Sequence, residues 1–174
     1  MRKVVIILFV ALLAACTSID CPVQNSVYTV YSLKKADGSA DTLKTDTLWV
    51  WTPRVNGSGA SRDDVFDAND TVLINRLYGD KASSFSLPIS YTLPEDTLCL
   101  LLCDKDKVFY HDTIFVKKEN YPHFESVDCQ ASYFHTITDV RWTNNFIDAV
   151  VINNPNVTYD ASTEHFHLYL KTDR

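Results

Sequence analysis

The segment HFHLYLK, residues 165–171, decides the fold class because its apolar and polar side chains alternate strictly. A β-strand places successive side chains on opposite faces of its sheet. The apolar set is Phe166, Leu168 and Leu170, and the other set is His165, His167, Tyr169 and Lys171. This division predicts a strand with one face in the core and one face in water, as in antiparallel sheets.

The same period of two runs through most of the chain. Short segments rich in β-branched and aromatic residues occupy 27–33, 47–52, 71–77, 84–90, 97–103, 107–117, 133–140, 146–153 and 165–171. Turn-forming residues separate them, and no segment sustains a helical period. About nine such strands predict an all-β fold, an antiparallel β-sandwich of the Ig-like or jelly-roll-like kind. A partly closed barrel is the alternative.

The N-terminus has the features of a lipoprotein export signal. A basic start, MRK, precedes an apolar run over residues 4–15, which is too short to cross about 30 Å of hydrocarbon comfortably. The sequence LAAC at 13–16 resembles the bacterial lipobox, whose cysteine is acylated and becomes the mature N-terminus. We therefore predict a cleaved signal peptide at 1–15, a lipidated tether at 16–26 and a β-sandwich domain at 27–174, with Cys16 as the lipid anchor.

The charge balance and the missing motifs limit the function. Removal of residues 1–15 leaves 14 basic and 22 acidic residues, a net charge of −8. This acidity, without a Lys/Arg cluster, argues against binding to nucleic acid and against an electrostatic membrane patch. The sequence has no nucleophile elbow, zinc-protease motif, phosphate-binding glycine loop or Cys-x-x-Cys. We predict no cofactor and no enzymatic activity.

Four cysteines remain beside Cys16, and an oxidising compartment favours their pairing. They are Cys21, Cys99, Cys103 and Cys129, with three ways to pair. Along one strand Cys99 and Cys103 lie about 13 Å apart, whereas a disulfide needs Cα atoms within about 7 Å. These two can pair only if the strand breaks near the turn at 104–106. Cys21 and Cys129 are placed to tie the N-terminal segment to the domain, and we predict that they form a disulfide.

The C-terminal region supports a family resemblance. HFESVDCQASYFHTITDV at 123–140 and FIDAVVINNPNVTYDASTEHFHLYLK at 146–171 combine a cysteine, a strand, an Asn-Pro turn and a final strand. This pattern resembles a family of small Bacteroidota lipoproteins, a domain of unknown function. The family's second cysteine after the lipid cysteine corresponds to Cys21, which supports its pairing with Cys129. The resemblance implies no catalytic residues.

Five Asp-Thr-aliphatic triplets resemble an O-glycosylation signal of exported proteins in that phylum. The candidate acceptors are Thr42, Thr47, Thr71, Thr97 and Thr113. The competing explanation is structural, because Asp favours turns and Thr with an aliphatic residue favours strands. Thr42 and Thr71 adjoin polar stretches and are better candidates than Thr113.

Two further pairs are candidate binding residues. His165 and His167 could direct their imidazoles toward one metal, but the sequence offers no third ligand, so we predict an exposed strand face and no metal site. Trp49 and Trp51 share a strand face and are expected in the core. Exposed indoles there would instead favour stacking on sugar rings.

Together these features predict a cell-envelope lipoprotein, anchored by lipid to the outer membrane on its periplasmic or surface face. We expect a non-enzymatic structural or interaction role with an envelope protein or a glycan, and no nucleic-acid partner. The alternative is a carbohydrate- or ligand-binding accessory module. A third hypothesis, a hydrolase, would need a cleft with paired carboxylates, or Cys99 or Cys103 beside a histidine.

Overall fold

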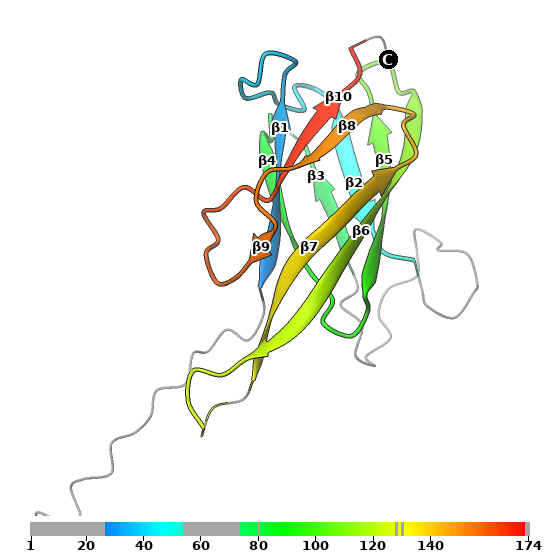
Figure 1. Ribbon diagram of the computed structural model, residues 1–174. Helices are drawn as coiled ribbons and strands as arrows, with labels where there is room; N and C mark the ends of the chain where they lie inside the picture. Colours follow the sequence, from blue (N-terminus) through cyan, green and yellow to red (C-terminus); the bar gives the residue numbers. More distant parts are fainter. Residues whose placement is uncertain (1–26, 54–73, 80, 128, 130, 173–174) are drawn as a thin grey trace, which may run out of the picture.

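The computed structural model describes residues 27–53, 74–79, 81–127, 129 and 131–172, and this part of the chain is all β-strand and loop. The described residues include no helix that is long and apolar enough to span a membrane. Two sheets pack face to face, which confirms the predicted β-sandwich (Figure 1).

The first sheet has four strands in the order β4-β1-β10-β8, and the second has six in the order β3-β2-β5-β6-β7-β9. The strands are β1 (Tyr28–Lys34), β2 (Thr47–Trp51), β3 (Asn75–Tyr78), β4 (Ser84–Pro88), β5 (Glu95–Cys103), β6 (Phe109–His123), β7 (Ser132–Trp142), β8 (Ile147–Ile152), β9 (Asn156–Val157) and β10 (Phe166–Leu170). The sequence pattern predicts all of these except the short β9. All neighbouring strands are antiparallel apart from β1 and β10, which are parallel.

Alternation along each strand builds the core between the sheets. In β5, Leu98, Leu100 and Leu102 are buried, while the residues between them are only half-buried. In β10, Phe166 and Leu168 are fully buried, as the opening segment predicts. The ring of Tyr31 lies between Phe166 and Phe85, with ring centroids at 4.7 and 5.2 Å. This stack joins β4, β1 and β10 on the inner face of the smaller sheet.

An irregularity in β7 changes which of its residues face the core. Lys117 of β6 pairs with Asp139, but Lys118 pairs with Ile137, so Thr138 is an extra residue on β7. Such a bulge shifts the alternation of the longer strand by one residue. His135 and Ile137, before the bulge, are therefore buried, whereas Val140 and Trp142 pack against the core after it.

The β6–β7 hairpin is longer than the rest of the sandwich. β6 has 15 residues instead of the shorter strand at 107–117 that the sequence predicts. At about 3.4 Å per residue this strand is about 50 Å long. Its far end extends beyond the neighbouring strands at the lower end of the molecule (Figure 1).

Candidate functional site

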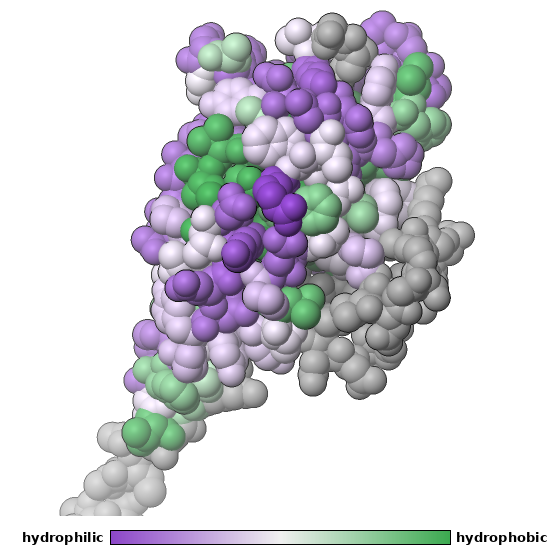
Figure 2. Space-filling view, turned by 45° about the vertical axis from the view of Figure 1, so that its right-hand side comes forward, coloured by the Kyte–Doolittle hydropathy of each residue, from purple (hydrophilic) through white to green (hydrophobic). Residues whose placement is uncertain are grey.

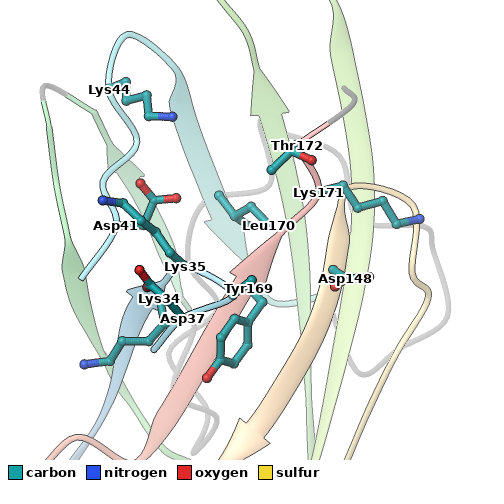
Figure 3. A pocket seen from close by; sticks show the side chains of 11 residues that line it. Lys34, Lys35, Asp37, Asp41, Lys44, Asp148, Tyr169, Leu170, Lys171 and Thr172 are labelled. Carbon is teal, nitrogen blue, oxygen red and sulfur yellow. The ribbon is translucent and has the colours of Figure 1, made fainter. Parts of the chain in front are cut away.

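A wide hollow lies at the end of the sandwich where β1 and β10 finish and β8 starts. Because β1 and β10 are parallel, Lys34 and Tyr169 lie side by side there. The hollow has a volume of about 840 Å³ and is open to solvent (Figure 3). Its lining consists of Lys34, Lys35, Ala36, Asp37, Asp41, Lys44, Asp148, Tyr169, Leu170, Lys171 and Thr172.

The charged groups of the hollow include both signs, and several already have protein partners. Lys34 Nζ lies 2.9 Å from Glu164 Oε2, and Lys171 Nζ donates to Asn144 O at 2.8 Å. Asp37 accepts two hydrogen bonds from Ser39, which lower the pKa of its carboxyl. Lys35 and Lys44 are exposed. The hollow therefore presents charged and polar groups of both signs to solvent.

Opposite the hollow, aromatic rings line the projecting end of the β6–β7 hairpin. His123 stacks on Phe134 with ring centroids at 4.2 Å, and Tyr159 packs edge-on against Phe134 at 4.9 Å. Tyr121 also contacts Phe134, and Tyr91 stacks on Tyr133 at 4.8 Å. The rings of Tyr121, His123, Phe134 and Tyr159 form a platform on one face of the hairpin, whereas the Tyr91–Tyr133 stack lies on the other face, because Tyr133 and Phe134 are consecutive in β7.

Beyond this platform the chain exposes apolar side chains. Phe124 is 62% exposed and Val127 is 98% exposed. The space-filling view shows apolar residues at this lower, projecting end (Figure 2). The sequence pattern did not predict this surface, because the alternation of apolar and polar residues ends at 117. KENYPH at 118–123 places polar Lys118 and Asn120 at the inward positions, so no apolar pattern marks the continuation of the strand.

The two histidines of the opening segment occupy different environments. His165 precedes β10 and is fully buried, where its Nδ1 accepts a hydrogen bond from Val30 N at 3.0 Å. Burial lowers the pKa of its imidazole. His167 lies on the outer face, 2.9 Å from Glu164 Oε2. The expectation that both lie on one exposed face is therefore wrong. The ring of His165 is buried because it accepts the hydrogen bond from the backbone amide of Val30 in β1. Within the described ranges no three His, Cys, Asp or Glu side chains could hold a metal together.

A polar network is buried between β5, β6 and β7. The Lys118 side chain is 0% exposed, and its Nζ lies 2.9 Å from Asp96 Oδ1 and donates to Leu93 O at 3.0 Å. Burial raises the pKa of Asp96 and lowers that of Lys118, while their mutual attraction opposes both shifts. Asn120 donates to Leu93 O and has its Oδ1 2.7 Å from His135 Nδ1. These groups satisfy one another, so the network holds the sheet together.

Cys99 and Cys103 both lie in the unbroken strand β5, so they do not pair with each other, as the spacing predicts, and both are free. Burial raises the pKa of the Cys99 thiol, which disfavours the reactive thiolate. Cys129 is half-buried near the projecting hairpin end and is disulfide-bonded. Cys16 and Cys21 lie outside the described residues, so the Cys21–Cys129 pair and the lipid anchor stay predictions.

Three Asp residues of the Asp-Thr triplets have structural roles. Asp41 accepts from Thr42 N, Asp96 binds Lys118, and Asp112 accepts from three backbone amides of the β7–β8 turn. Among the threonines, Thr47 is exposed, whereas Thr42, Thr97 and Thr113 are half-buried. Thr71 lies outside the described residues. The turn-and-strand explanation therefore accounts for these three acidic positions, and glycosylation of the threonines stays a prediction.

Trp49 and Trp51 are not in the core, contrary to the expectation from the sequence. The residues between and before them, Leu48 and Val50, are fully buried instead. Both indoles lie on the outer face of the six-stranded sheet and are half-buried. On the same face, Arg141 lies over the ring of Phe115 at 4.9 Å from its centroid.

Comparison with known proteins gives a family and no function. No curated protein and no solved structure matches the chain significantly. A model of DUF6452, a family of unknown function, matches residues 59–170. This segment covers more than half of the chain and runs from before β3 to the end of β10. The chain belongs to the DUF6452 family of unknown function.

Proposed function

We propose that this chain is a lipid-anchored lipoprotein of the bacterial outer membrane with a non-enzymatic interaction role, as the resemblance to Bacteroidota lipoproteins implies. The observation that carries the proposal is the direction of β1. This strand starts at the end with the projecting hairpin and finishes at the hollow lined by Lys34 and Tyr169. A tether that runs from Cys16 into β1 would leave the hollow facing away from the bilayer, where a partner could reach it.

The buried polar groups support a role without catalysis. The Lys118–Asp96 pair and the buried ring of His135 lie inside the sandwich, and each has a protein partner. Perturbed pKa values in a cleft are typical of catalytic groups, but these groups are enclosed by the sheets. The disulfide bond of Cys129 supports an oxidising compartment.

The anchor is tested by Cys16→Ala in the native host. Acyl chains gain about 0.8 kcal/mol per buried CH₂, so two or three of them hold a protein stably on a membrane. We expect nearly all of the wild-type protein in the membrane fraction and nearly all of the variant in the soluble fraction. The matched control is Cys99→Ala, which removes a free cysteine of β5 and should leave the protein in the membrane. Membrane retention of Cys16→Ala after loss of lipid labelling would contradict the proposal.

A second candidate function is glycan binding, which the outward direction of Trp49 and Trp51 favours. Aromatic faces of this kind stack on apolar faces of other rings. We expect hexose oligosaccharides to change the tryptophan emission saturably, and Trp49→Leu to abolish this response. The Trp142→Phe control, at a residue packed against the core, should retain it. A response that is absent or unsaturable at millimolar sugar would rule out this candidate.

A further inference from the structure

The projecting end of the hairpin exposes two aromatic residues and a valine to solvent. We call this surface the hairpin tip and define it by Tyr121, Phe124 and Val127, which are 40%, 62% and 98% exposed. The platform behind it includes His123, which stacks on Phe134 and lies 3.0 Å from Glu125 Oε1. The tip is therefore held out from the body, so its exposure is a property of the fold.

The hairpin tip lies at the same end of the molecule as the start of β1. Tyr28 at the start of β1 pairs with Pro88 at the end of β4. Three residues later, Tyr91 stacks on Tyr133, which pairs with Pro122 of β6. Figure 1 shows the same arrangement, with the β6–β7 turn beyond the first residues of β1.

The length of the tether sets how far the tip can lie from the acylated residue. The eleven Cα–Cα steps from Cys16 to Val27 span at most about 40 Å. A Cys21–Cys129 disulfide would shorten this reach, because five residues span at most about 18 Å and a disulfide adds about 6 Å between Cα atoms. Val127 is two residues from Cys129. With Cys16 anchored in a bilayer, these lengths would hold the hairpin tip near the bilayer surface.

We propose that Phe124 and Val127 insert into the interface of the bilayer in which Cys16 is anchored; this inference rests on the proposed function. Apolar side chains at the boundary between headgroups and acyl chains gain free energy by leaving water, and Tyr is favoured at the headgroup level. The charged residues near the tip in the sequence are Lys117, Lys118, Glu119, Glu125 and Asp128, and Lys118 is buried in the Asp96 pair, so the sequence around the tip has no basic cluster that would select anionic lipid. The contact is apolar, and it fixes the sandwich upright with the hollow away from the membrane.

The test is quenching of an introduced tryptophan by brominated phosphatidylcholine. The acylated full-length chain is reconstituted in these vesicles as Phe124→Trp and, as the matched control, as Phe109→Trp. Phe109 is 58% exposed and lies at the opposite end of β6, so both variants keep the same three native tryptophans. Both substitutions replace one exposed aromatic residue by another.

We expect the added emission of Phe124→Trp to fall by at least half in brominated vesicles, and that of Phe109→Trp to stay unchanged. Equal quenching of the two variants would overturn the inference. A tip that binds a protein partner instead of the bilayer would give this result. Mass spectrometry of the same samples separates the two proposals. A chain without lipid at Cys16 would overturn the proposed function. An acylated Phe124→Trp chain whose introduced indole stays unquenched would overturn only the membrane contact of the tip.

Discussion

Replacing Asp112 by alanine is expected to lower the free energy of unfolding by about 3–5 kcal/mol. The Asp112 carboxylate is 3% exposed and accepts hydrogen bonds from the backbone amides of Asn145, Phe146 and Ile147 at 2.8–3.1 Å. It also accepts from the Thr143 hydroxyl. The substitution leaves these amides of the β7–β8 turn without their acceptor, and each buried unsatisfied donor costs about 1–3 kcal/mol.

Thermal and urea unfolding of the full chain measure this loss. For a chain of this size, the expected change corresponds to a fall of about 10 °C in Tm. The matched control is Asp148→Ala, because Asp148 is an exposed aspartate on the neighbouring strand β8. It should change stability by less than about 0.5 kcal/mol. A loss below about 1 kcal/mol for Asp112→Ala would show that the turn does not depend on this carboxylate.

The second large effect is a loss of stability in acid that His135 causes. Burial lowers the pKa of His135 from 6.5 to about 4, with a smaller contribution from the charge of Lys118. Its Nδ1 faces the Asn120 carbonyl oxygen, whose amide nitrogen donates to Tyr91 O and Leu93 O. This network assigns the hydrogen of the neutral ring to Nδ1.

The direction of the pH effect follows from proton binding. Above pH 6.5 the imidazole is neutral in both the folded and the unfolded chain, and the full stability is present. As the pH falls from 6.5 to about 4, His135 binds a proton in the unfolded chain but not in the folded chain, so the free energy of unfolding falls across this interval. A shift of this size corresponds to about 3 kcal/mol.

The variant His135→Asn tests this dependence, since the asparagine amide can donate to Asn120 from the position of Nδ1. Urea unfolding between about pH 7 and pH 4 should show a loss about 3 kcal/mol smaller in the variant than in the wild type. Burial raises the pKa of Asp96, so Asp96 has the opposite effect on stability in acid. This effect is present in both the variant and the wild type and cancels when the two are compared. His111→Asn keeps His135 and should keep the full acid loss. Equal losses in His135→Asn and the wild type would contradict the assignment.

The strands could be predicted from the sequence because most of them alternate between one apolar and one polar face. HFHLYLK places Phe166 and Leu168 in the core as this pattern requires. The spacing of Cys99 and Cys103 likewise excludes a disulfide between the two, because strand geometry alone holds them too far apart. In these cases a local rule is sufficient.

Where both faces are apolar or the partner is distant, local rules were insufficient. The run LWVW at 48–51 has two apolar faces, and only the packing of the second sheet selects Leu48 and Val50 for the core. The burial of His165 depends on Val30, 135 residues away in the chain. The extra residue Thr138 and the parallel pairing of β1 with β10 also arise from contacts between distant segments. The hollow is lined by residues of β1, β8 and β10, which are far apart in the sequence, so no short motif predicts it.

We propose that Cys16 anchors the chain to a membrane at the end from which the hairpin projects. The decisive measurement is mass spectrometry of the mature protein from its native envelope, without reduction. We expect an N-terminal peptide that begins at an acylated Cys16 and is linked through Cys21 to the peptide with Cys129, with Cys99 and Cys103 as free thiols. An unlipidated chain would show that the anchor is wrong, and a disulfide that joins Cys129 to another cysteine would show that the Cys21 link is wrong.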